Sequence, residues 1–222
     1  MNPALIRLLQ LSSPALPVGA YTYSQGLEWA VESGVVTSEA SAGSWIGDCL
    51  AHGAARFEAV YLAHMLAAWT RDDSARLAQL DAEFLASRET AELRAETLQM
   101  GHSLAKLIDG LPECAGAGLD AFPSPSFPLA WSRVAARWGI AAETAVAGYL
   151  WAWAENQVMA ALKAVPLGQT AGQRLLLALG AQVAELATEA VAMPLESTHN
   201  FLPAFAIASS LHETQYTRIF RS

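Results

Sequence analysis

Apolar residues recur at intervals of three and four over most of the chain, which is the spacing of one face of an α-helix. No segment shows the strict alternation of apolar and polar residues that a half-buried strand requires. The pattern therefore predicts an all-α fold. Helices are expected at 3–11, 37–70, around 77–85 and 93–107, at 128–139, 141–165 and 171–192, and from about 203. A further short helix is entered from the segment 21–28 and ends near 34.

The segment 141–165 is apolar around most of its circumference, and such a helix is usually surrounded by other helices. Pro166 must end it, because proline has no N–H to donate and disfavours helical angles in the residue before it. Gly168 permits a turn, and Thr170 with Gln173 fits a reciprocal capping box that would begin the next helix. We therefore expect a bundle built around a buried central helix.

The chain of 222 residues is long enough to bury a large core in one domain. Its longest irregular stretch, 111–127, is rich in Gly, Pro and Ser. Apolar density is similar on both sides of this stretch, so a surface loop is favoured over a linker. We predict a single domain over 1–222 whose last residues, from about 215, form a flexible, loosely packed tail.

Hydrophobic residues make up 53% of the chain and charged residues only 15%, which suggests that partners cover some apolar surface. The net charge of −8 argues against binding to nucleic acid. The longest uncharged run contains a proline and is too short to span a bilayer, so no membrane association is expected. The first residues lack a cleavage-site pattern, and two separated cysteines make no disulfide framework. These features predict a cytoplasmic protein.

No motif in the chain predicts catalysis or a bound cofactor. The break at 168–174 fails as a phosphate loop, because its spacing is wrong, arginine replaces the lysine, and it follows a helix. Cys49 and His52 are three residues apart and could offer two metal ligands, but a buried thiol beside an imidazole is the favoured interpretation. The protein is therefore not expected to be an enzyme.

Two groups of polar residues need explanation. Glu155, Asn156 and Gln157 lie midway along the central helix, where an unpaired buried polar group would cost roughly 1–3 kcal/mol. They either form an internal network, face a partner, or line an internal water path. The end of the chain alternates aromatic residues with arginines, which is the composition of interface anchors.

Three stretches together resemble one family, the F-type urease accessory proteins. They are SPALPVGAYTYSQGLE (13–28), VPLGQTAGQRLL (165–176) and HETQYTRIFRS (212–222). Tyr21 stands where the family pattern has Phe, and Ser126-Phe-Pro128 where the family often has His before the proline.

The resemblance implies an all-helical, non-catalytic scaffold or chaperone that helps to assemble the nickel site of urease. It implies binding to the D-type (H-type) accessory protein, through it to the urease apoenzyme, and recruitment of the G-type GTPase, with a homodimer in some complexes. The residues implied at the partner surface are Pro17, Gly19, Ser24, Gln25, Glu28, Pro166, Gly168, Gln169, Gln173, Arg174, His212, Glu213, Tyr216, Arg218, Phe220 and Arg221.

Two alternatives to the scaffold are left open. A direct activator of the GTPase would insert Arg174, Arg218 or Arg221 into the partner's active site to stabilise transition-state charge. A metal carrier would use Cys49, His52 or the other histidines as nickel ligands.

Overall fold

The computed structural model describes residues 3–114, 116 and 118–222, and in this part of the chain it has helices and no strand, which confirms the all-α prediction. The α-helices are α1 (Pro3–Leu11), α2 (Leu27–Glu32), α3 (Glu39–Asp48), α4 (Glu58–Thr70), α5 (Ser74–Ala86), α6 (Ala91–Asp109), α7 (Phe127–Arg137), α8 (Ala142–Ala164), α9 (Gln169–Ala192) and α10 (Pro203–His212). The 3₁₀ turns are η1 (Ala20–Thr22), η3 (Pro112–Cys114), η4 (Leu119–Ala121) and η5 (Leu195–Ser197), and η2 (Cys49–Ala54) is a π-helical turn.

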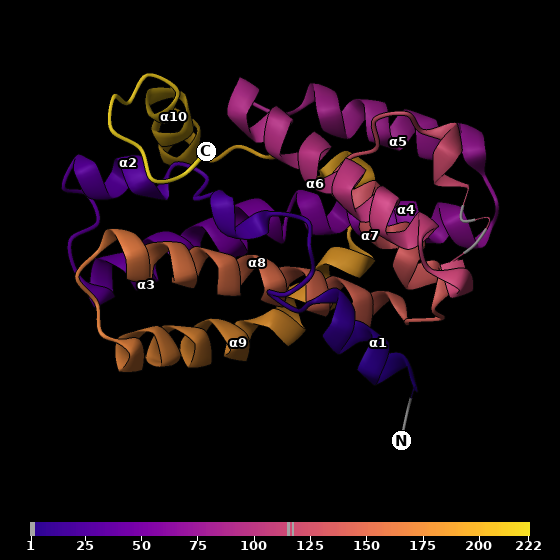
Figure 1. Cartoon of the computed structure of the whole chain (residues 1–222), viewed down its shortest axis with the longest axis horizontal. Helices are drawn as coiled ribbons and strands as arrows, with labels where there is room; N and C mark the ends of the chain where they lie inside the picture. Colours follow the sequence, from indigo (N-terminus) through magenta and orange to yellow (C-terminus); the bar gives the residue numbers. More distant parts are fainter. Residues whose placement is uncertain (1–2, 115, 117) are drawn as a thin grey trace.

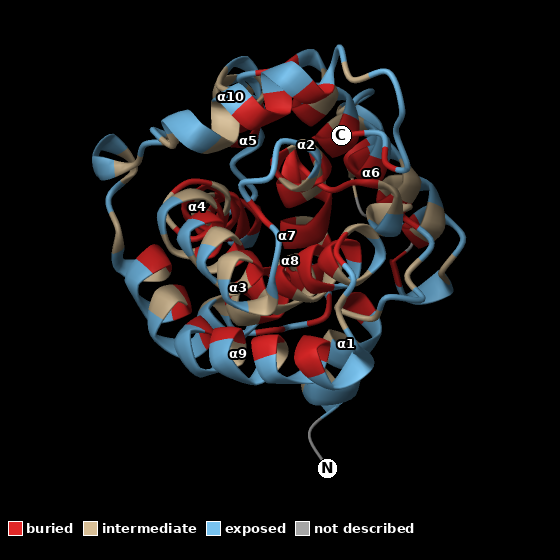
Figure 2. Cartoon of the chain, turned by 90° about the vertical axis from the view of Figure 1, so that its left-hand side faces the viewer, coloured by how far each residue is buried: buried red, intermediate tan, exposed pale blue. Residues whose placement is uncertain are grey.

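Helix α8 lies in the middle of the molecule, as the sequence predicted, and packs against α1, α2, α3, α4 and α9 (Figure 1). Small residues set how closely its neighbours approach. A Cβ added at Gly148 would meet the Leu8 side chain of α1, and one at Gly172 of α9 would lie 2.7 Å from Leu162 Cδ1. Figure 2 shows buried residues gathered at α7 and α8 and an exposed outer face on α9.

The break after α8 occurs where Pro166 predicted it, with Val165 extended at φ −108° and ψ 143°. The prediction of a capping box at Thr170 is wrong, because α9 already begins at Gln169 and its N-cap, Gly168, makes no side-chain bond. Gly168 has φ −79°, and an added Cβ would meet nothing within 4 Å. The turn therefore rests on proline and extended backbone and does not need a left-handed glycine.

The single helix predicted over 37–70 is divided in the structure. Ser38 does cap its start through a capping box with Ser41, but η2 follows α3, and Phe57 (φ −125°, ψ −72°) separates it from α4. The bend places Glu58 inside the protein, 2.8 Å from Arg88. Apolar spacing missed the division because apolar residues continue on both sides of the π-helical turn.

Helix α9 is long and apolar enough to cross a bilayer by length and composition alone, with 33% of the relevant window buried. In the structure it runs along α8 and buries one face against it, which is how a core-facing helix of a bundle behaves. The outer face keeps apolar side chains in solvent, and Leu177 is 76% exposed.

Candidate partner-binding surface

The end of the chain packs against the segment that precedes α2. The Arg221 backbone N–H donates to the Thr22 carbonyl over 2.8 Å, and the Ser24 and Gln25 N–H groups donate to the Ser222 carbonyl over 2.7 and 3.0 Å. Figure 1 shows this last segment ending between α2 and α10. Two stretches nearly 200 residues apart in the sequence thus form one surface.

Glu28, in the first turn of α2, holds the tail through both carboxylate oxygens. Its Oε1 accepts from the Ile219 N–H over 2.6 Å, and its Oε2 accepts from the Phe220 N–H over 2.9 Å. The His212 ring contributes a third contact, with Nε2 3.2 Å from Oε2. Three contacts converge on this one carboxyl group, so this side chain anchors the tail.

The start of α6 supplies further carboxylates. Glu92 Oε2 lies 2.7 Å from His212 Nδ1, and its Oε1 accepts from Arg218 Nη1 over 2.6 Å. Deeper in α6, Glu96 accepts from Gln25 Nε2 over 2.7 Å and from Ser222 Oγ over 2.8 Å. We call Ser24, Gln25, Glu28, Glu92, Glu96 and His212 the tail-binding cluster.

A left-handed turn allows α2 to reach α10 at this point. Gln25 and Gly26 have φ values of 54° and 79°. A Cβ at Gly26 would lie 2.8 Å from the Ser209 backbone nitrogen, so glycine is required there both for conformation and for space. Ser209 is itself held, because its hydroxyl lies 2.9 Å from Thr90 Oγ1.

The prediction of a loosely packed tail is therefore wrong for the last residues. Phe220 is 5% exposed and Ser222 is fully buried, whereas Tyr216 is fully exposed and Ile219 is 67% exposed. The sequence pattern missed this because the contacts that hold the tail are backbone N–H groups and distant carboxylates. The tail is docked, and it presents two large apolar side chains to solvent.

The structure separates the predicted partner residues into a surface set and a supporting set. Pro17, Pro166, Gly168, Gln169, Gln173, Arg174, Glu213, Tyr216, Arg218 and Arg221 are exposed, and Gly19 is half-buried. Ser24, Gln25, Glu28, His212 and Phe220 are buried. The second set cannot contact a partner in this conformation, and its members instead position the tail.

The second motif lies at the same end of the molecule, below the tail (Figure 1). Lys163 lies at the end of α8, just before the second motif. Its Nζ is 5.8 Å from the centre of the Tyr21 ring and 5.5 Å from that of the Phe220 ring, so it contacts both the first and the third motif. Arg174 makes a two-pronged contact with Glu39 of α3, over 2.8 and 2.6 Å. The three motifs therefore share one end of the molecule, although only the first and third interlock.

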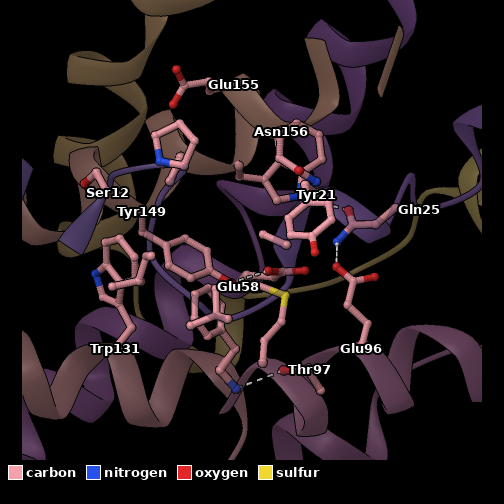
Figure 3. A pocket seen from close by; sticks show the side chains of 18 of the residues that line it. Ser12, Tyr21, Gln25, Glu58, Glu96, Thr97, Trp131, Tyr149, Glu155 and Asn156 are labelled. Carbon is pink, nitrogen blue, oxygen red and sulfur yellow. Dashed lines mark hydrogen bonds between the residues drawn. The ribbon is translucent and has the colours of Figure 1, made fainter. Parts of the chain in front are cut away.

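A cavity of about 170 Å³ opens beside the tail-binding cluster, between the 12–21 segment and α8 (Figure 3). Its floor holds a buried ion pair between Glu58 and Arg88, and the Tyr149 hydroxyl donates to Glu58 over 2.6 Å. Three buried polar atoms of the lining have no hydrogen-bond partner among the described residues: Ser12 Oγ, Arg88 Nε and Trp131 Nε1. Sequence reasoning identified none of these residues, because they come from five different segments.

The polar residues of the central helix differ in their surroundings. Asn156 donates to the Tyr23 carbonyl over 3.0 Å, so it supports the tail-bound segment. Glu155 lines the cavity and is half-buried, and burial raises the pKa of its carboxyl. Gln157 is buried, and its Nε2 has no hydrogen-bond partner among the described residues. No single internal network explains all three.

Burial raises the pKa of the Glu96 carboxyl to about 7, from an ordinary value of 4.5, because the bonds from Gln25 and Ser222 only partly offset desolvation. Glu58 raises this pKa further and Arg88 lowers it. A carboxyl with a raised pKa binds its proton more tightly in the folded state. The contribution of Glu96 to folding stability therefore falls as pH rises from about 4.5 to 7, and the loss is complete above that range.

We therefore expect Glu96→Gln to remove part of the pH dependence of stability. The free energy of unfolding of both proteins should be measured in urea between pH 5 and 8. The value for the variant should rise relative to that of the wild type as pH rises, because glutamine stays neutral. Glu185→Gln, at an exposed position on α9, is the matched control and should run parallel to the wild type. Parallel curves for Glu96→Gln would refute the assignment.

Within the described residues, no group of three His, Cys, Asp or Glu side chains could hold a metal ion. Cys49 and His52 both lie in η2, and burial raises the pKa of the Cys49 thiol to about 12. Cys49 is 6% exposed, as expected for a small buried thiol.

Comparison with known proteins gives one consistent result. A family model described as UreF matches residues 36–180. The urease accessory protein UreF of Azoarcus sp. (strain BH72) is 61% identical over 231 aligned positions that cover 100% of this chain and 99% of that protein. The proteins of the same name from Dechloromonas aromatica (strain RCB) and Methylobacillus flagellatus are 57% and 47% identical, covering 98% and 99% of this chain and 97% and 98% of their own lengths.

Proposed function

The chain belongs to the UreF family of urease accessory proteins, and from this premise we propose that it is a non-catalytic scaffold in the assembly of the nickel site of urease. In this proposal it binds the D-type (H-type) accessory protein, reaches the urease apoenzyme through it, and recruits the G-type GTPase. A homodimer, implied by the resemblance, stays a prediction.

The observation that carries the proposal is the docked tail. The tail-binding cluster uses two buried glutamates and a buried histidine to hold a short segment whose Tyr216 and Ile219 side chains face solvent. A purely structural terminus has no need to present large apolar groups outward, whereas interface hot spots are rich in tyrosine and arginine. Arg218 lies between these two residues in the chain and Arg221 follows them, and both arginines are exposed.

The proposal is tested by substituting the two exposed side chains of the tail while leaving the buried residues that hold it unchanged. Tyr216→Ser with Ile219→Ser should leave the melting temperature nearly unchanged, because both side chains are exposed. It should reduce capture of the purified D-type partner, and urease activation in cells, by tenfold or more if each anchor contributes about 1–2 kcal/mol. Leu177→Ser on the outer face of α9 is the matched control. Full urease activation by the double variant would refute the proposal that the tail is the partner surface.

The direct GTPase activator is the second candidate, and the observation in its favour is that Arg221 is exposed and its side chain bonds to Tyr23 and not to a carboxylate of the described residues. Arg174 and Arg218 are each paired with a carboxylate, so either would have to leave Glu39 or Glu92 to enter a partner. Single-turnover GTP hydrolysis by the GTPase, with each arginine changed to alanine in turn, decides between the candidates. A large loss in the rate of GTP hydrolysis on substitution of one arginine, and not of the others, would favour the direct activator.

A further inference from the structure

The His212 ring lies between two carboxyl groups of the tail-binding cluster. Its Nδ1 is 2.7 Å from Glu92 Oε2, its Nε2 is 3.2 Å from Glu28 Oε2, and the residue is fully buried. A neutral imidazole has one N–H donor and one bare nitrogen, whereas a carboxylate can only accept hydrogen bonds. A neutral imidazole and two carboxylates therefore cannot satisfy both contacts. The three side chains must share one additional proton, and this count is the same whether the proton lies on the ring or on a carboxyl oxygen.

The charged groups that meet at the ring come from every element packed around it. Glu28 belongs to α2 and Glu92 to α6, while Arg218 of the tail contacts Glu92 Oε1 over 2.6 Å. Glu213, the next residue after the ring, is exposed and accepts the Glu92 backbone N–H over 3.2 Å. Loss of the additional proton makes the net charge of this group more negative by one and leaves two acceptors facing each other at the buried ring. Both consequences are costly in a buried site.

The ring cannot easily leave its two carboxyl groups. Helix α10 approaches α2 so closely that a Cβ added at Gly26 would lie 2.8 Å from the Ser209 backbone nitrogen. The Ser209 hydroxyl lies 2.9 Å from Thr90 Oγ1, at the start of α6. These contacts hold α10, and with it the ring, against both α2 and α6.

The tail is the part that can move away. Within 213–222, all of which the structure describes, Phe220 is the only buried apolar side chain, and Tyr216 and Ile219 are exposed. Its other contacts are hydrogen bonds, and Glu28 accepts two of them, from the backbone N–H groups of Ile219 and Phe220. Undocking exposes little apolar surface and gives the carboxyl groups at the ring access to water. Release of the tail is therefore the least costly response to loss of the proton.

We propose that docking of the tail depends on the proton shared by His212, Glu28 and Glu92, so that the tail is docked while the proton is held and is released when the proton is lost as pH rises. The inference rests on the proposed function, because the tail is the proposed partner surface, and it adds regulation by pH to that surface.

Glu92→Gln is the deciding variant. Its amide N–H can donate to the bare nitrogen of a neutral His212 ring while its carbonyl accepts from Arg218, so both contacts are satisfied without the additional proton. Docking is measured by the protection of the amides of residues 219 and 220 from hydrogen exchange, expressed relative to the intrinsic exchange rate at each pH.

The measurement covers about pH 5 to 8.5, the range in which histidine side chains usually change charge. We expect protection in the wild type to fall by about tenfold or more relative to protection in Glu92→Gln as pH rises, since one proton allows a change of up to about tenfold per pH unit.

Two further variants complete the comparison. Glu32→Gln, exposed one turn after Glu28 in α2, removes a nearby negative charge without touching the ring and should follow the wild type. His212→Gln has no titrating ring, so its protection should run parallel to that of Glu92→Gln even if the tail docks less tightly. Glu96 is present in all four proteins, so its own ionisation, at a pKa that burial raises to about 7, cancels in the comparison.

Parallel curves for the wild type and Glu92→Gln would overturn the proposal, and so would a tail that is unprotected in the wild type at the lowest pH. Capture of the purified D-type partner at both ends of the pH range is scored separately. Capture that stays constant while protection of the tail falls would reject the tail as the partner surface but leave its proton-dependent docking standing.

Discussion

Replacing Glu28 by alanine should release the tail. The change leaves the Ile219 and Phe220 N–H groups and His212 Nε2 without their acceptor. Each unsatisfied buried group costs roughly 1–3 kcal/mol, and undocking of the segment lets water satisfy them instead. We expect a loss of about 2–4 kcal/mol in folding stability and a strong loss of partner capture, because Tyr216 and Ile219 would no longer be held in place.

Trypsin cleavage and hydrogen exchange measure the release directly. Cleavage after Arg218 and exchange at the amides of residues 219 and 220 should accelerate in Glu28→Ala. Glu28→Gln should have a smaller effect, since its carbonyl can still accept one N–H while its amide group faces the other. Glu32→Ala, exposed one turn later in α2, is the matched control. Unchanged protection of the two amides would show that other contacts hold the tail.

Gly101→Ala should be strongly destabilising, although alanine is normally the better helix former by about 1 kcal/mol. A Cβ at Gly101 of α6 would lie 2.7 Å from the Ser126 carbonyl carbon, and closer still to the Pro125 oxygen. The opposing backbone cannot easily move away. Ser126 N donates to Asp81 over 3.1 Å, and Phe127 N donates to Thr97 over 3.0 Å.

We expect Gly101→Ala to cost about 3 kcal/mol, which for a chain of this size lowers the melting temperature by roughly 6–12 °C. Gly47→Ala in α3 is the matched control, because a Cβ there would make an ordinary contact of 3.9 Å with Leu179 Cδ2. That variant should be neutral or slightly stabilised in a thermal melt. Equal melting temperatures for the two variants would contradict the packing of α6 against the start of α7.

The sequence by itself determined the helical class, the central helix and the break after it. These features depend on local physics: the spacing of apolar residues, the missing N–H of Pro166, and the cap at Ser38. It also singled out the three motifs and, through them, the family. The division between α3 and α4 escaped it, because a π-helical turn leaves the surrounding run of apolar residues unchanged.

Only the tertiary structure decided what the motif residues do. Ser24, Gln25 and Glu28 read as surface residues in the sequence, because polar side chains are usually exposed. They are buried here because the tail brings backbone donors to them from the other end of the chain. The same holds for the cavity, whose lining forms only when the 12–21 segment, α4, α6, α7 and α8 pack together. Contacts between residues far apart in the sequence leave no local pattern, which is the physical reason that the site had to be seen in three dimensions.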